Sequence, residues 1–146
     1  MNPELMALVA DLRFHHLGVA VKSIAEALPA YKALFGYALE AGPVTDPVQK
    51  VTVCFLRSDR PNDLVIELVE PAAEKSAVNT ILAKGMGTYH TCYEVADVAK
   101  ALDAFRSGGC VVVSNPVPAA AFDNRPIAWF YTPTRQLIEL VQREGA

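Results

Sequence analysis

A histidine opens each of two similar segments of this chain. HLGVAVKSIAEALPAYK (residues 16–32) aligns without a gap on HTCYEVADVAKALDAFR (residues 90–106), and the alignment places His16 over His90. A repeated pattern of this length indicates a duplicated module. Imidazole nitrogens serve as metal ligands and as proton carriers, so the duplication supplies two candidate site residues.

A glutamate closes each copy of the pattern. VIELVE (65–70) aligns with LIELVQ (137–142), which places Glu67 over Glu139. In each copy the glutamate shares its strand face with apolar side chains, because alternate residues of a strand point the same way. A carboxylate in such a place is costly unless something satisfies it.

The four side chains together suit one shared cation. Two neutral imidazoles and two carboxylates balance a divalent ion, and this donor set suits Zn²⁺, Ni²⁺, Co²⁺, Mn²⁺ or Fe²⁺. The alternative is that Glu67 and Glu139 face solvent on edge strands, with His16 and His90 as satisfied structural histidines. The matched placement in both halves favours the metal site.

Periodicity and turn signals predict the elements that position these residues. In the first half we expect a helix capped by Ser23 over 23–35 and strands over 14–21, 51–56 and 64–69. In the second half we expect a helix capped by Asp97 over 98–107 and strands over 88–95, 110–113, 127–131 and 136–141. Further helices are predicted over 3–12 and 76–84, and a mobile loop over 115–124. Each half is then a β-α-β-β-β unit.

Composition narrows the class of protein. The chain has 146 residues, 52% of them hydrophobic and 20% charged, which is enough for one packed domain over residues 1–146. A net charge of −3 argues against nucleic acid as a partner. No apolar run is long enough to span a bilayer, and the N-terminus lacks the basic region of a signal peptide. Three cysteines without C-x-x-C spacing are typical of a reduced, cytoplasmic protein.

Four motifs, FHHLGVAV, ELVEP, GTYHTCYEV and QLIELVQ, resemble the vicinal oxygen chelate superfamily from about Arg13 to Arg143. This superfamily includes glyoxalase I, methylmalonyl-CoA epimerase, extradiol dioxygenases and the fosfomycin and bleomycin resistance proteins. The resemblance implies an α+β fold in which two tandem modules, about 13–71 and 87–143, form a curved, mixed sheet around a metal cup. It also implies a homodimer.

The resemblance places one divalent metal ion on His16, Glu67, His90 and Glu139. A His-Glu-His-Glu set resembles glyoxalase I and the epimerase-like members, which move protons. The stretch ELVEPAAEKSAVNTILAKGMGTYHTCYEV is closer to methylmalonyl-CoA epimerase.

The implied function is a metal-dependent proton transfer on a small acyl thioester through a metal-bound enolate, with Glu67 and Glu139 as the catalytic bases. Two alternatives stay open. One is a glyoxalase I-type lactoylglutathione lyase acting on a glutathione thioester, and the other is a metal-free protein of the same fold that sequesters an apolar ligand.

Other residues have weaker signals. We expect His15 to pack behind the site, Cys92 to fill space on the His90 face, and Trp129 to pack in the core. Four cations could bind an anion but are more simply surface residues: Lys50, Arg57, Arg60 and Arg125.

Overall fold

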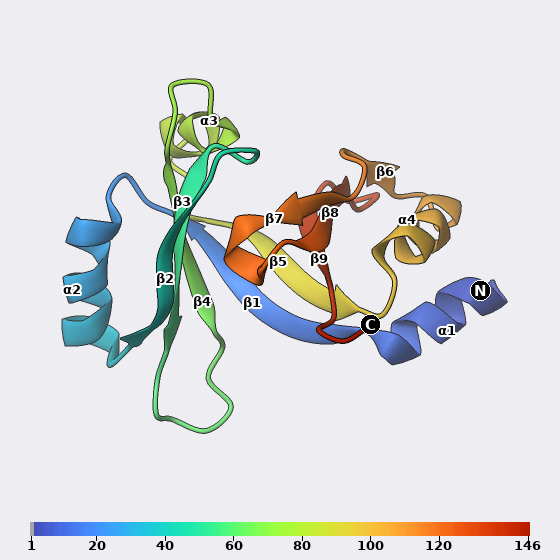
Figure 1. The fold of residues 1–146 in the computed structure, drawn as a ribbon, viewed down its shortest axis with the longest axis horizontal. Helices are drawn as coiled ribbons and strands as arrows, with labels where there is room; N and C mark the ends of the chain where they lie inside the picture. Colours follow the sequence, from blue (N-terminus) through green and yellow to red (C-terminus); the bar gives the residue numbers. More distant parts are fainter. Residues whose placement is uncertain (1) are drawn as a thin grey trace. The chain divides into compact units, whose positions relative to one another are not determined.

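The computed structural model describes residues 2–146. Within these residues the chain forms four α-helices, one 3-10 helix and nine β-strands with parallel and antiparallel pairing, which is an α+β fold (Figure 1). The chain divides into two compact units, residues 16–89 (the first unit) and residues 2–15 with 90–146 (the second unit). No helix in the described range is long and apolar enough to cross a membrane.

The first unit has the β-α-β-β-β order expected of a module, with β2 (Ala38–Asp46) as a strand that no predicted segment covers. Its elements are β1 (Arg13–Ala20, from His16 onward), α2 (Ile24–Phe35), β2, β3 (Val51–Arg57), β4 (Ile66–Pro71) and α3 (Ala77–Ala83). The strand order is β2-β3-β4-β1, with β1 parallel to β4 and the other neighbours antiparallel. β4 therefore has a partner strand on each side.

Helix α2 lies against one face of this sheet (Figure 1). The Ser23 hydroxyl accepts a hydrogen bond from the Glu26 amide at 3.2 Å, as the predicted N-cap requires, and Gly36 ends the helix in the left-handed conformation. The helix continues through Pro29, which lacks the N–H needed to bond the preceding turn. Apolar packing against buried Leu56 and Leu68 stabilises the helix on the sheet.

The second unit has the same order with α1 (Pro3–Asp11), β7 (Val117–Ala119) and η1 (Ala120–Phe122) added. Its elements are α1, the start of β1, β5 (Thr88–Val95, from His90 onward), α4 (Val98–Ser107), β6 (Val111–Val112), β7, η1, β8 (Arg125–Tyr131) and β9 (Leu137–Gln142). The strand order is β5-β9-β8-β6, with β7 also paired to β8. β5 runs parallel to β9 and the other pairs are antiparallel, so β9 is flanked on both sides as β4 is.

The predicted N-terminal helix packs within the second unit. Leu8 of α1 contacts the buried core of that unit, and α1 lies beside α4. Asp11 accepts a hydrogen bond from the Ala96 amide at 2.9 Å and forms an ion pair with Arg143. The Ala96 hydrogen bond lowers the pKa of the Asp11 carboxyl from its usual range, and the Arg143 guanidinium adds to the shift.

Two segments differ from the sequence prediction. β2 has no predicted counterpart because almost all of its side chains are exposed, so it shows no alternation of apolar and polar residues. The mobile loop predicted over 115–124 is wrong for residues 117–122, which form β7 and η1. β7 is held by backbone pairing with β8, in which Val117 lies opposite Ile127, and by the buried side chain of Phe122 that follows it.

Candidate metal centre

His16 and Glu67 form a buried pair in the first unit. The parallel pairing of β1 with β4 sets Gly18 opposite Glu67, so the glutamate lies across from the residue two places beyond the histidine. His16 and Gly18 point to the same face because strand side chains alternate. The Nε2 atom of His16 lies 3.3 Å from Oε1 of Glu67, and the two residues are 0% and 5% exposed.

His90 and Glu139 form the matching pair in the second unit. The parallel pairing of β5 with β9 sets Cys92 opposite Glu139, so the glutamate again lies across from the residue two places beyond the histidine. The Nε2 atom of His90 lies 3.6 Å from Oε1 of Glu139, and each residue is 3% exposed. The duplication inferred from the sequence is thus reproduced in strand register and in side-chain placement.

An aromatic ring accompanies each pair at an equivalent position. In the first unit Phe55 of β3 lies opposite Glu67, and its ring meets that of His16 edge-on with centroids 5.4 Å apart. In the second unit Trp129 of β8 lies opposite Glu139, and its ring meets that of His90 edge-on at 4.8 Å. Each unit therefore holds a histidine, a glutamate and an aromatic ring in one arrangement.

The donor atoms of each pair suit a divalent ion. Two ligands about 2.0–2.2 Å from an ion lie roughly 2.9–3.6 Å apart in tetrahedral or octahedral coordination, which spans both measured distances. Burial removes the water that would otherwise solvate the two carboxylates. The described residues therefore contain histidine–glutamate groups that could bind a divalent metal ion.

The same geometry excludes one of the alternatives drawn from the sequence. If Glu67 and Glu139 were solvent-facing residues of edge strands, they would be exposed, and β4 and β9 would have a partner on only one side. Both glutamates are buried and both strands are flanked on each side.

Other candidate residues lie in ordinary structural settings. His15 meets the ring of Phe122 edge-on at 5.3 Å, which agrees with a packing role. Cys92 is fully buried. Arg57 pairs with Glu40 through Nε at 2.6 Å on the surface.

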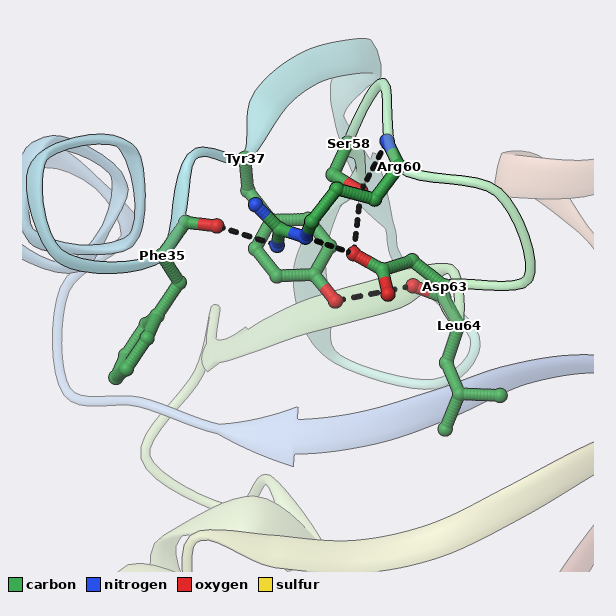
Figure 2. Close-up of polar contacts among 6 residues, drawn as sticks. All are labelled: Phe35, Tyr37, Ser58, Arg60, Asp63 and Leu64. Carbon is green, nitrogen blue, oxygen red and sulfur yellow. Dashed lines mark hydrogen bonds and ion pairs between the residues drawn. The ribbon is translucent and has the colours of Figure 1, made fainter.

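Arg60 joins the β3–β4 turn to the end of α2 (Figure 2). Its Nε atom donates to the Asp63 carboxylate at 2.6 Å, and its Nη2 atom donates to the Phe35 carbonyl at 2.5 Å. The guanidinium also lies 5.6 Å from the centre of the Tyr37 ring. These contacts give Arg60 a structural role, since a cation at a helix C-terminus stabilises the exposed carbonyls.

Sequence reasoning missed the placement of Phe55 and Trp129. Trp129 is expected to pack in the core, and the ring that it packs against is that of the buried His90. The available signal was the hairpin ahead of each glutamate, because an antiparallel hairpin sets a residue of the preceding strand directly opposite it. The exact partner depends on the length of the turn.

Comparison with known proteins agrees with the fold. The sequence profile of the glyoxalase/bleomycin resistance protein/dioxygenase superfamily matches residues 15–129. An ethylmalonyl-CoA/methylmalonyl-CoA epimerase of Cereibacter sphaeroides is 31% identical over 121 residues, which cover 82% of this chain and 87% of the relative.

Two solved structures show the same fold. A hypothetical protein of Bacillus halodurans has a TM-score of 0.79 at 26% identity, covering 92% of this chain and 96% of its own. A variant of Streptomyces coelicolor methylmalonyl-CoA epimerase in complex with 2-nitronate-propionyl-CoA has a TM-score of 0.75 at 27% identity, covering 91% and 98%. By profile, sequence and fold, this chain belongs to the glyoxalase/bleomycin resistance protein/dioxygenase superfamily.

Proposed function

We propose that this protein is a metal-dependent proton-transfer enzyme that epimerises a small acyl-CoA thioester, in the manner of methylmalonyl-CoA epimerase. The observation that carries the proposal is the matched pair of buried histidine–glutamate groups, one in each unit. Support comes from the epimerase relative that aligns with most of the chain.

In this proposal His16, Glu67, His90 and Glu139 together hold one divalent ion. When bound, such an ion acts as a Lewis acid that polarises a substrate carbonyl and makes the neighbouring C–H more acidic. The histidines remain neutral ligands. The glutamates supply the negative charge and also the groups that exchange protons.

Epimerisation needs a base on each face of the planar enolate, because the proton leaves one side and returns on the other. Glu67 and Glu139 are the two candidates, since they occupy equivalent register positions in two similarly built units.

The test is solvent deuterium incorporation at the α-carbon of methylmalonyl-CoA in D₂O, followed by mass spectrometry. Glu67→Gln and Glu139→Gln should each slow exchange by roughly 10²–10⁴-fold, the usual loss for removing a general base. Glu74→Gln is the matched control, because Glu74 is exposed and lies outside the site. Elemental analysis must show that both site variants keep their ion.

Wild-type exchange rates in both site variants, with the ion still bound, would rule out the two-base mechanism. If wild-type protein exchanges no acyl-CoA but forms lactoylglutathione from methylglyoxal and glutathione, it is a glyoxalase I-type lyase. If it binds no metal and catalyses neither reaction, it is a ligand-sequestering protein of the same fold.

A further inference from the structure

The two aromatic positions beside the histidine–glutamate pairs differ in one respect. Phe55 and Trp129 occupy equivalent places opposite Glu67 and Glu139. A phenyl ring is therefore sufficient to pack against a histidine at this place in the module. The indole of Trp129 adds one hydrogen-bond donor, the Nε1–H group, to the second unit.

That donor is unused within the described residues. Nε1 of Trp129 is shielded from solvent and has no hydrogen-bond partner. Most buried polar groups in proteins are hydrogen-bonded, because an unpaired one loses its contacts with water without replacement. Phenylalanine would remove this penalty and keep the ring contact with His90, so packing alone does not account for tryptophan here.

We propose that Trp129 is a substrate-binding residue whose indole N–H donates a hydrogen bond to a carboxylate oxygen of the bound acyl thioester. This inference rests on the proposed function and adds to it the residue that recognises the free carboxylate of the thioester. The indole lies on the strand next to Glu139, where a substrate carboxylate meets a like charge. A hydrogen-bond donor at this place offsets that repulsion.

A single tryptophan makes the donor directly observable. The chain contains one tryptophan, so ¹⁵N-labelled protein gives one indole N–H signal in a two-dimensional NMR spectrum. In Zn²⁺-loaded protein, methylmalonyl-CoA should move the indole proton downfield and slow its exchange with water, because a new hydrogen bond forms. Propionyl-CoA, which lacks the carboxylate, should produce neither change.

The second measurement is binding by calorimetry to Zn²⁺-loaded variants. Trp129→Phe should weaken methylmalonyl-CoA roughly 10–100-fold, the range for losing a hydrogen bond to a charged group, and leave propionyl-CoA unchanged. Tyr131→Phe is the matched control, because it removes a polar atom from the exposed end of the same strand and should leave both affinities unchanged. A merely structural role for Trp129 would weaken both thioesters equally.

The inference is overturned if the indole signal responds equally to the two thioesters, or if Trp129→Phe binds methylmalonyl-CoA as tightly as wild type. If either result is found and the wild type still exchanges deuterium, only the role of Trp129 is overturned and the proposed function is retained. Selective binding of methylmalonyl-CoA through Trp129 without exchange supports this inference and defeats the proposed epimerase. Wild-type protein that does not bind methylmalonyl-CoA overturns both.

Discussion

Two histidine–glutamate pairs are buried in this protein, and this determines the effect of substituting one member of a pair. Glu67 and Glu139 are almost inaccessible, and each has an imidazole within 3.6 Å. Removing one member leaves the other buried without its polar partner, which costs about 1–3 kcal/mol. For this reason the functional tests use Glu→Gln, which keeps the side-chain shape.

Cys54 is a buried ionisable group on β3 that the proposed chemistry does not use. The thiol is fully buried, and burial together with the nearby Glu67 and Glu70 charges raises its pKa to about 11, from an ordinary value near 9.0. The folded protein therefore keeps the thiol neutral at pH values where the unfolded chain ionises it.

We expect Cys54 to make the folded state lose stability in alkali. Its contribution is complete below about pH 9 and declines as the pH rises to about 11, because the unfolded chain loses the thiol proton first. The full loss, from a shift of about two pKa units at 1.36 kcal/mol each, is about 3 kcal/mol. Urea unfolding of wild type and Cys54→Ala between pH 8 and 11 checks this, since other titrating groups are common to both proteins. A stability difference that stays constant with pH would contradict the prediction.

The end of α2 depends on a glycine and an arginine acting together. Gly36 has φ 72°, and a Cβ added there would lie 2.9 Å from Nη1 of Arg60. Arg60 in turn holds the Phe35 carbonyl (Figure 2). Gly85 also has φ 72°, but nothing lies within 4 Å of a Cβ added there. A substitution at Gly85 therefore measures the backbone strain alone, without a side-chain clash.

Gly36→Ala should therefore destabilise the protein more than Gly85→Ala. The strain of a left-handed alanine costs about 1–2 kcal/mol at either site, and displacing Arg60 from the carbonyl adds about 1 kcal/mol at Gly36 alone. Free energies of unfolding in urea measure both values. In an Arg60→Ala background the two glycine substitutions should cost the same. An unchanged difference in that background would show that Arg60 is not the cause.

The two units together raise the question of how many ions one chain binds. The proposal that all four ligands serve a single ion predicts one divalent ion per chain. It also predicts that His16→Ala and His90→Ala each abolish that binding, because each removes a ligand of the same ion. Loss of a ligand should exceed the roughly 10–100-fold cost of losing an outer-shell partner.

Elemental analysis and calorimetric titration with Zn²⁺ measure the number of ions and the affinity. The matched control is His15→Ala, the third histidine of the chain, which contacts Phe122 and should leave binding intact. Chelation should lower the melting temperature of wild type and of His15→Ala but not of the two ligand variants, since an ion that binds only the folded state stabilises it. Two ions per chain, or one pair that still binds when the other is mutated, would show separate sites.

A homodimer, near twice the 15.8 kDa of one chain, stays a prediction.

Local sequence signals predicted most of the elements, because those signals act between neighbours in the chain. Ser23 and Asp97 cap the helices predicted to follow them, and the helix bounds agree within a residue. The repeat also identified His16 with Glu67 and His90 with Glu139 as equivalent pairs, since equal spacing in a duplicated module gives equal strand register. These features need no knowledge of distant contacts.

Tertiary contacts decided the rest. β2 is a strand through its backbone pairing with β3, which no property of its own exposed residues indicates. α1 joins the second unit through Asp11, whose partner Arg143 lies 132 positions away. The placement of Trp129 against His90 likewise follows from how β8 and β9 pair. These contacts depend on the packing free energy summed over the whole chain. They therefore cannot be predicted from any short stretch of the sequence.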